Sequence, residues 1–195
     1  MSVTEGILLA AGRSRRAGTF KMEMELAGKP LLVWSLEAMA AVCERIIVVA
    51  GFAPEKIRRL VKNWPGIEVL VNENFAGGML TSIQTGIRLV RAPRFFILPG
   101  DMPLINPPVY QKLLAVKAEI VVPLYQGRRG HPVLLAGSLI PKLLAEPLES
   151  SLGRFIMRRG SETVEVGDPG ILADLDDMDD IKKTDALLRA RGKNE

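Results

Sequence analysis

The chain has 195 residues, of which 48% are hydrophobic and 25% charged, and 26 Lys and Arg against 22 Asp and Glu give a formal net charge of +4. This composition excludes a disordered chain, the single cysteine excludes a disulfide scaffold or a zinc site built from cysteine pairs, and the length fits one domain over 1–195. No uncharged run is long enough for a transmembrane helix, and an acidic residue precedes the first apolar run, so we expect a cytoplasmic protein with no signal peptide and no membrane partner.

Short apolar runs alternate with longer amphipathic segments along most of the chain. The apolar runs lack strict alternation, as in parallel strands buried on both faces, and cover 6–11, 45–50, 68–71, 95–98 and 120–123. The segments between them predict helices over 30–42, 54–63, 78–91 and 107–117. Further on we expect a strand over 131–136, helices over 139–145 and 151–159, a strand over 163–166 and a helix starting near 178. This order predicts an α/β fold with three α/β/α layers around a mostly parallel sheet.

The connection between the first strand and the first helix, over 11–29, is far longer than the roughly 2–6 residues usual for such loops. It starts at the carboxyl end of a strand, where doubly wound sheets bind their ligands. Gly12 and Gly18 allow close approach of the backbone, and the basic run over 13–16 adds positive charge. Backbone N–H groups and nearby cations together form an anion cradle, so we expect this loop to bind a polyphosphate.

Two common phosphate motifs are absent from this loop. Walker A needs four residues between its first glycine and Gly-Lys, whereas five separate Gly12 from Gly18 and Thr19 follows. The dinucleotide motif GxGxxG is also missing. The alternative is a basic patch that binds nucleic acid. Such patches are broader and carry aromatic residues for stacking, and aromatic residues are only 5% of this chain, so we expect no nucleic-acid partner.

The first loop reads LAAGRSRRAG over 9–18, has a lysine at Lys21, and continues as GKPLL over 28–32. This pattern resembles the LAAGxSxRMGxxK and GKPLL motifs of the MobA-like nucleotidyltransferases. The resemblance implies a glycosyltransferase-A-like, Rossmann-like fold with a nucleotide-binding half over 1–105 and an acceptor-binding half over 106–195. It also implies catalytic roles for Arg16 and Lys21. The nucleotide-binding residues it implies in this loop are Leu9, Ala10, Ala11, Gly12, Arg13, Ser14 and Gly18.

Asp101 is the only aspartate before Asp168, and it directly follows an apolar run. We expect it at the same sheet edge as the first loop, where a carboxylate suits Mg²⁺, which prefers one or two carboxylates with phosphate oxygens and water. The alternative is that Asp101 caps a helix or closes a turn. The string GDMP over 100–103 resembles the metal-binding motif of the same family, which implies that Asp101 is a catalytic Mg²⁺ ligand.

A second carboxylate pair, Asp174 and Asp176, follows a short apolar run. Two residues apart, they would share a face if this segment is extended. The segment resembles the DxDTPED stretch of the family, which implies that Asp174 completes the metal site, with Asp176 as the reserve ligand. Residues 177–180 depart from the TPED part of that stretch, and their acidic groups would favour the start of the last helix without any metal.

Gly77 and Gly78 connect the expected third strand to the next helix, and Ser82 lies one turn into that helix. An ordinary cap and turn would account for these residues. The family pattern N…GMxxSI implies instead that Gly78 and Ser82 lie near the nucleobase or ribose. The string AAG over 10–12 resembles the cytidylyl-transferring branch, whereas guanylyl-transferring relatives typically have LAGG.

The only histidine, His131, lies in the string GRRGHPVL over 127–134. A lone histidine is usually a surface or core residue, but Arg128 and Arg129 just before it make this segment a second anion site. The string resembles the acceptor-facing segment of molybdenum cofactor cytidylyltransferases. The resemblance implies that Arg128, Arg129 and His131 bind a molybdopterin-type acceptor.

Taken together, these resemblances imply transfer of CMP from CTP to a phosphorylated acceptor, with molybdopterin carrying molybdenum as the preferred acceptor, Mg²⁺ as cofactor and pyrophosphate as product. An acceptor phosphate is already ionised at neutral pH, so no general base is needed, and we expect Cys43 to be a core residue on the apolar face of the first helix. The alternatives are a MobA-like enzyme with a sugar or polyol phosphate as acceptor, and a nucleotide-binding regulatory module without catalysis. The resemblance also implies a molybdoenzyme or a maturation chaperone as a partner and leaves the oligomeric state open.

Overall fold

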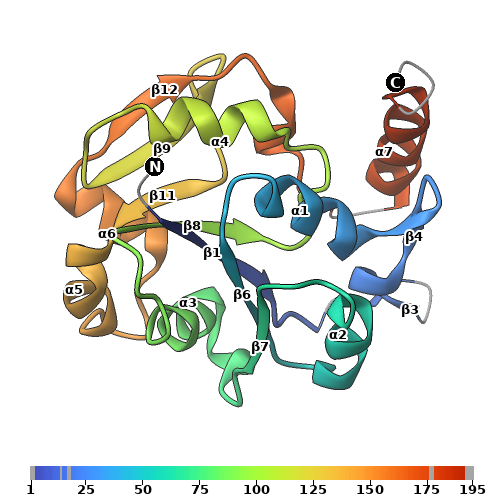
Figure 1. The fold of residues 1–195 in the computed structure, drawn as a ribbon, viewed down its shortest axis with the longest axis horizontal. Coiled ribbons are helices and arrows are strands. Elements are labelled where there is room, and N and C mark those ends of the chain that lie inside the picture. Colours follow the sequence, from blue (N-terminus) through green and yellow to red (C-terminus); the bar gives the residue numbers. More distant parts are fainter. Residues whose placement is uncertain (1–2, 14, 17–18, 176–177, 192–195) are drawn as a thin grey trace.

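The computed structural model describes residues 3–13, 15–16, 19–175 and 178–191. Within these ranges the largest sheet has eight strands (Figure 1). Their order is β10 (Arg128–Arg129), β9 (Ile120–Tyr125), β11 (Val133–Ala136), β8 (Arg94–Pro99), β1 (Thr4–Ala10), β6 (Arg45–Ala50) and β7 (Ile67–Val71), with β12 (Glu162–Glu165) paired to β9. The pairs among β8, β1, β6 and β7 and the pair β9–β12 are parallel, whereas β11 is antiparallel to β8 and β9. The predicted mostly parallel sheet is therefore confirmed.

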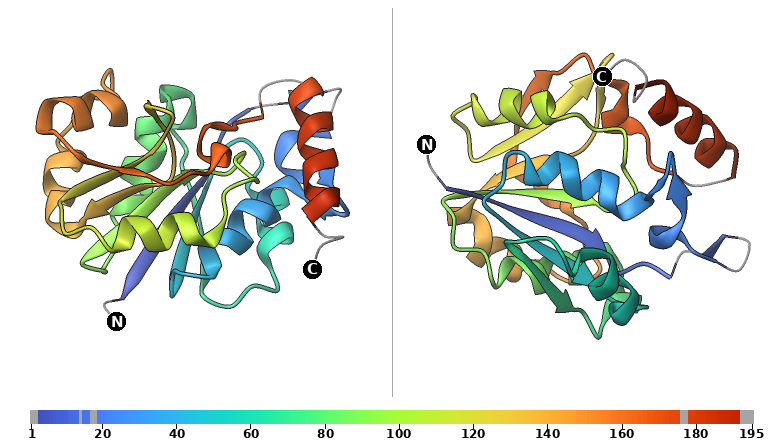
Figure 2. Two further views of the ribbon diagram at one scale, coloured as in Figure 1. Left: turned by 90° about the horizontal axis from the view of Figure 1, so that it is seen from above. Right: turned by 45° about the vertical axis from the view of Figure 1, so that its right-hand side comes forward.

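Helices cover both faces of this sheet, as Figures 1 and 2 show. One face packs against α1 (Leu31–Ala40), α2 (Pro54–Val61) and α4 (Pro107–Leu114), and α7 (Met178–Arg191) extends this core beside the short strand β4 (Glu25–Leu26). The other face packs against α3 (Met79–Ile87), α5 (Ile140–Leu144) and α6 (Leu152–Arg159). Successive side chains of a strand point to opposite faces, so Leu8 lies in the first core while Ile7 and Leu9 lie in the second. The three predicted layers are confirmed.

Two predicted helices end earlier than their apolar pattern suggests. The α3 helix ends at Ile87 rather than at 91, and α4 ends at Leu114 rather than at 117. After α3 the backbone N–H groups of Arg91 and Ala92 donate to the carboxylate of Glu5, at 2.6 and 3.1 Å. Because these N–H groups donate to the Glu5 carboxylate rather than to carbonyls of the preceding helical turn, the helix does not continue, and the chain turns toward β8.

The first loop is more ordered than predicted. The sequence predicts one long loop over 11–29, but the described part contains two short antiparallel strand pairs and a 3-10 turn. β2 (Arg15–Arg16) pairs with β3 (Thr19–Phe20), β4 (Glu25–Leu26) pairs with β5 (Lys29–Pro30), and the turn is η1 (Lys21–Glu23). Leu26 is fully buried, and its carbonyl accepts a hydrogen bond from Trp34 Nε1 at 2.8 Å. Apolar residues of the loop therefore join the core and hold it against α1.

The apolar run before Asp174 forms a 3-10 turn, η4 (Pro169–Leu172), because the Asp168 side chain caps it by accepting a hydrogen bond from Gly170 N at 2.8 Å. A shared face for Asp174 and Asp176 stays a prediction, since Asp176 lies outside the described residues. One further expectation needs correction. Cys43 lies beyond the end of α1 rather than within it, although it is buried as predicted. Burial raises the pKa of its thiol to about 12, which keeps the thiol protonated.

Among the described residues, no helix is long and apolar enough to cross a membrane.

Candidate active site

The carboxyl ends of β1, β6 and β8 meet at one edge of the sheet. Gly100 N donates to Leu9 O at 2.8 Å, and Phe52 N donates to Ala11 O at 3.3 Å, so the first loop starts between the two neighbouring strand ends. A Cβ atom at Gly51 would lie 2.6 Å from both Ala11 O and the Cβ of Phe75. The absence of a side chain at Gly51 therefore lets the first loop and the segment after β7 close on each other.

A cavity of about 270 Å³ opens at this edge, and we call it the edge cavity. Its walls come from the end of β1, the first loop, the start of α3 and the segment after β8. The lining residues are Leu9, Ala11, Gly12, Met22, Phe75, Gly78, Met79, Ser82, Pro99 and Asp101. The structure thus brings together Asp101 and most of the predicted nucleotide-binding positions. Ala10 is a buried strand residue paired with Ala50 and does not line this cavity.

Gly78 ends the segment after β7 and caps the N-terminus of α3. Its φ of 96° lies in the left-handed region that favours glycine, and Ser82 follows one turn later on the same helix. The predicted geometry of this helix start is therefore present. Arg13 lies beside it, with its guanidinium carbon 5.1 Å from the centre of the Phe75 ring.

Lys21 and Asp101 form an ion pair beside the edge cavity. Lys21 Nζ donates to Asp101 Oδ2 at 2.8 Å, and the Lys21 side chain is only 2% exposed, against 23% for Asp101. The two residues lie on η1 and after β8, so the pair joins the first loop to the strand edge. An ammonium group buried in this way requires a counter-charge, and Asp101 supplies it.

Some predicted site residues cannot be compared with the structure. Ser14, Gly18 and Asp176 lie outside the described residues, as does the side chain of Arg16. Their roles stay predictions.

The carboxylates fit a metal site only in part. Asp101 lines the edge cavity, and Asp174 follows η4 with an exposed side chain that lines neither this cavity nor the one described next. Across the described ranges, no group of three or more His, Cys, Asp and Glu side chains could hold a metal ion. A divalent cation held by Asp101 and Asp174 would therefore need ligands from the substrate, as Mg²⁺ does when it takes phosphate oxygens and water.

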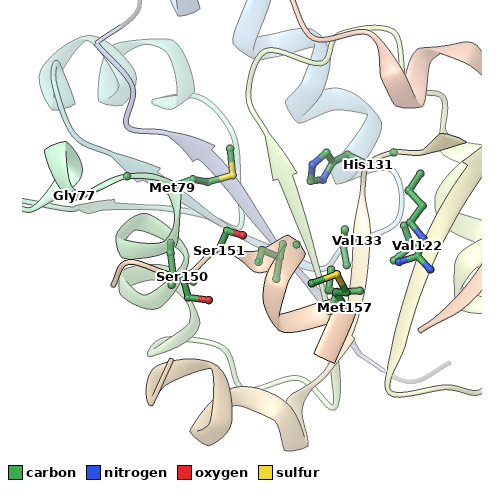
Figure 3. Close-up of a pocket in the computed structure, with 15 residues that line it drawn as sticks. Gly77, Met79, Val122, His131, Val133, Ser150, Ser151 and Met157 are labelled. Atoms are coloured by element: carbon green, nitrogen blue, oxygen red, sulfur yellow. The ribbon is translucent and has the colours of Figure 1, made fainter. Parts of the chain in front are cut away.

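A second cavity, of about 480 Å³, adjoins the first and shares Gly78 and Met79 with it. We call it the broad cavity. Its walls come from the start of α3, from β9 and β11, and from α6 with the segment before it (Figure 3). The lining residues are Gly77, Gly78, Met79, Leu80, Val122, Arg129, Gly130, His131, Val133, Ser150, Ser151, Leu152, Gly153, Ile156 and Met157. Of the three residues predicted to bind the acceptor, Arg129 and His131 line this cavity, whereas Arg128 is exposed on β10 and is not part of its lining.

Backbone hydrogen bonds to η4 and to β9 fix the position of His131. His131 N donates to Ile171 O at 3.0 Å, and Gly130 N donates to Pro123 O at 3.0 Å. A Cβ atom at Gly130 would lie 2.3 Å from Ile171 O, so only glycine fits before the histidine. His131 Nδ1 is enclosed without a hydrogen-bond partner among the described residues.

Burial lowers the pKa of His131 below its usual 6.5, although a backbone hydrogen bond with Ile97 and the charge of Asp101 act in the opposite direction. The imidazole is therefore neutral at neutral pH. The unfolded chain takes up this proton at a higher pH than the folded chain. The free energy of unfolding should consequently fall as the pH drops through the unfolded pKa, and this loss should stop below the folded pKa.

This dependence is measurable because His131 is the only histidine. Urea unfolding of the wild type and of His131→Gln between pH about 7.5 and about 5 should show a steeper loss of stability in the wild type. Parallel curves for the two proteins would show that the histidine pKa is the same in both states.

Sequence reasoning missed the apolar walls of both cavities. Phe75 and Met22 line the edge cavity, and Met157 of α6 lines the broad cavity. Met79 and Met157 are large apolar side chains that are 53% and 73% exposed. An exposed methionine is a signal of a binding surface, but it is visible only once exposure is known.

The chain is similar to known proteins both in sequence and in fold. The sequence model of a family described as "MobA-like NTP transferase domain" matches residues 6–164. Molybdenum cofactor cytidylyltransferase of Escherichia coli is 27% identical over 92% of this chain and 94% of its own length. Molybdenum cofactor guanylyltransferase of Cereibacter sphaeroides is also 27% identical, over 94% of this chain and 96% of its own length. The crystal structure of Rv0371C from Mycobacterium tuberculosis in complex with manganese has the same fold, with a TM-score of 0.80 at 23% identity over 94% of this chain and 98% of that one.

Proposed function

Because the chain belongs to the MobA-like NTP transferase family, we propose that it is a cytidylyltransferase that transfers CMP from CTP to molybdopterin carrying molybdenum and releases pyrophosphate. The observation that carries this proposal is the pair of adjoining cavities that share Gly78 and Met79. A nucleotidyl transfer between two substrates needs two such sites that meet at the reacting phosphates. The edge cavity takes the nucleotide, and the broad cavity takes the acceptor.

The charged groups support the placement of the phosphates. The first loop offers backbone N–H groups and Arg13, and Lys21 stands beside Asp101 at the same cavity. An oxygen of the acceptor phosphate attacks the α-phosphorus of CTP, and the bond from this phosphorus to the bridging oxygen of the leaving pyrophosphate breaks. Lys21 and Arg16 neutralise the charge that develops on the phosphates. The acceptor oxygen carries no proton that must be removed, so this step needs no general base.

We propose Asp101 and Asp174 as the residues that hold a divalent cation, Mg²⁺ by preference. Such an ion, when bound, neutralises and orients the phosphate groups. The manganese complex of Rv0371C supports a divalent cation in a protein of this fold.

The walls of the broad cavity favour a flat heterocyclic acceptor over a sugar phosphate. Val122, Leu152, Ile156 and the two methionines form an apolar surface, against which the hydroxyl groups of a sugar would lose water without gaining partners. Methionine sulfur makes favourable contacts with aromatic rings. Arg129 at the rim supplies a charge for the acceptor phosphate.

Sequence identity does not decide the choice of base, because the cytidylyltransferase and guanylyltransferase relatives are both 27% identical to this chain. The string AAG over 10–12 favours cytosine. Thermal unfolding in the presence of Mg²⁺ and each nucleoside triphosphate tests this choice, since a ligand at about 100 times its Kd stabilises the fold by about 2.7 kcal/mol. CTP should raise Tm most, and a larger shift with GTP would make the chain a guanylyltransferase. Release of pyrophosphate that requires both CTP and the acceptor separates an enzyme from a regulatory module.

A further inference from the structure

Asn72 directly follows β7 and is 3% exposed. Its backbone N–H donates to Ala50 O at 2.8 Å, which holds it at the same sheet edge as the edge cavity. Its side-chain amide makes three hydrogen bonds. Oδ1 accepts from Asn74 N at 3.0 Å, and Nδ2 donates to Thr81 Oγ1 at 2.9 Å and to Ser82 Oγ at 3.0 Å.

These partners allow only one orientation of the amide. A backbone N–H can only donate, so the atom facing Asn74 N must be the amide oxygen. The NH₂ group then faces the two hydroxyls, and each of its protons is used by one of them. The Asn72 side chain therefore acts as a donor toward Ser82.

This orientation determines the direction of the Ser82 hydroxyl. Ser82 Oγ accepts a hydrogen bond from Asn72, and Ser82 lines the edge cavity. Thr81 differs, because its hydroxyl reaches the carbonyls of Asn74 and Gly78, at 2.9 and 2.8 Å, and Thr81 does not line the cavity. No described residue accepts a hydrogen bond from Ser82, so its proton is available to a ligand in the cavity.

We propose that Asn72 is a positioning residue that presents the Ser82 hydroxyl as a hydrogen-bond donor to the nucleobase, and that it thereby favours cytosine over guanine. The phosphates go to Lys21 and the first loop, which leaves the uncharged base for the part of the cavity formed by Phe75, Met79 and Ser82. Cytosine offers two acceptors, O2 and N3, on its pairing edge. Guanine offers two donors, N1–H and N2–H, with one acceptor, O6. The inference rests on the proposed nucleotidyl transfer and deepens it.

The test compares the Kd values of CTP and GTP in the presence of Mg²⁺, without acceptor, by calorimetry. In Asn72→Asp one carboxylate oxygen still accepts from Asn74 N, while the other replaces the NH₂ group and accepts from Ser82. The hydroxyl then points away from the base. We expect the preference for CTP over GTP to fall about tenfold, the usual effect of one lost hydrogen bond. The added negative charge weakens both nucleotides alike and cancels in this ratio.

Two further variants make the result specific. Ser82→Ala should lower the same ratio, and Asn72→Asp should have no further effect on the ratio when Ser82 is already alanine. Thr81→Val is the matched control, because it removes the other hydroxyl partner of Asn72 without changing the cavity lining, and the ratio should stay that of the wild type.

The outcomes separate the two proposals. If the wild type binds neither CTP nor GTP, the proposed function is wrong. If it binds CTP but Asn72→Asp or Ser82→Ala weakens both nucleotides by the same factor, the role of Asn72 is overturned while the function stands. If Asn72→Asp does not fold, Asn72→Ala takes its place, because it also removes the donor to Ser82, and a ratio of the two Kd values equal to that of the wild type would overturn the role of Asn72.

Discussion

Asp101→Asn is expected to lower kcat for the proposed CMP transfer by roughly 10²–10³-fold, because it removes a negative charge from the proposed site for the cation and the phosphates. The asparagine side chain has almost the same shape, and its amide oxygen can still accept the hydrogen bond from Lys21 Nζ. The variant should therefore still fold, and its loss of turnover can be measured on the folded protein. Pyrophosphate release measures turnover, and binding of Mn²⁺ with CTP, followed by electron paramagnetic resonance, should weaken in parallel.

Glu37→Gln is the matched control for Asp101→Asn. Glu37 pairs with Lys29 at 2.8 Å, so the change removes the same type of ion pair at a distance from both cavities. Turnover of this variant should equal that of the wild type. Full activity in Asp101→Asn would remove Asp101 from both the metal site and the chemistry.

Lys21→Met is expected to lower kcat by roughly 10²-fold while changing the free energy of unfolding by about 1 kcal/mol or less. The ammonium group of Lys21 is almost fully buried, and methionine fills much of the same space without a charge that must lose its hydration. Replacing a buried charge with an apolar group of similar volume is often neutral for stability. Turnover should suffer because the phosphates lose a fixed cation.

The two single variants of this ion pair should both lose activity but should differ in stability. Asp101→Asn keeps the buried ammonium and removes its counter-charge, so it should destabilise the fold more than Lys21→Met does. The double variant should regain stability and remain inactive, as urea unfolding and pyrophosphate release would show. A double variant that is less stable than Asp101→Asn would contradict this explanation.

The sequence alone predicted most of the fold, because each element has its own local signal. The run over 45–50 became β6 with the same limits, and the proline at 54 begins α2 as expected. Strands buried on both faces must be apolar throughout, and helices at a sheet must be apolar on one side, so both patterns can be read from neighbouring residues. The helix ends were less predictable, since the end of α3 depends on Glu5, far away in the chain.

The candidate site was predictable wherever a residue type is restricted by its chemistry or its backbone. Gly12 and Asp101 follow strands, and Gly78 directly precedes a helix. These positions lie together because parallel strands end at one edge of the sheet. Only the tertiary structure showed that Lys21 pairs with Asp101, that Met157 lines a cavity, and that Asn72 donates a hydrogen bond to Ser82. Each of these contacts joins residues from different elements. The strength and direction of such contacts depend on distance, burial and the partners that share each proton, none of which is encoded in a local pattern.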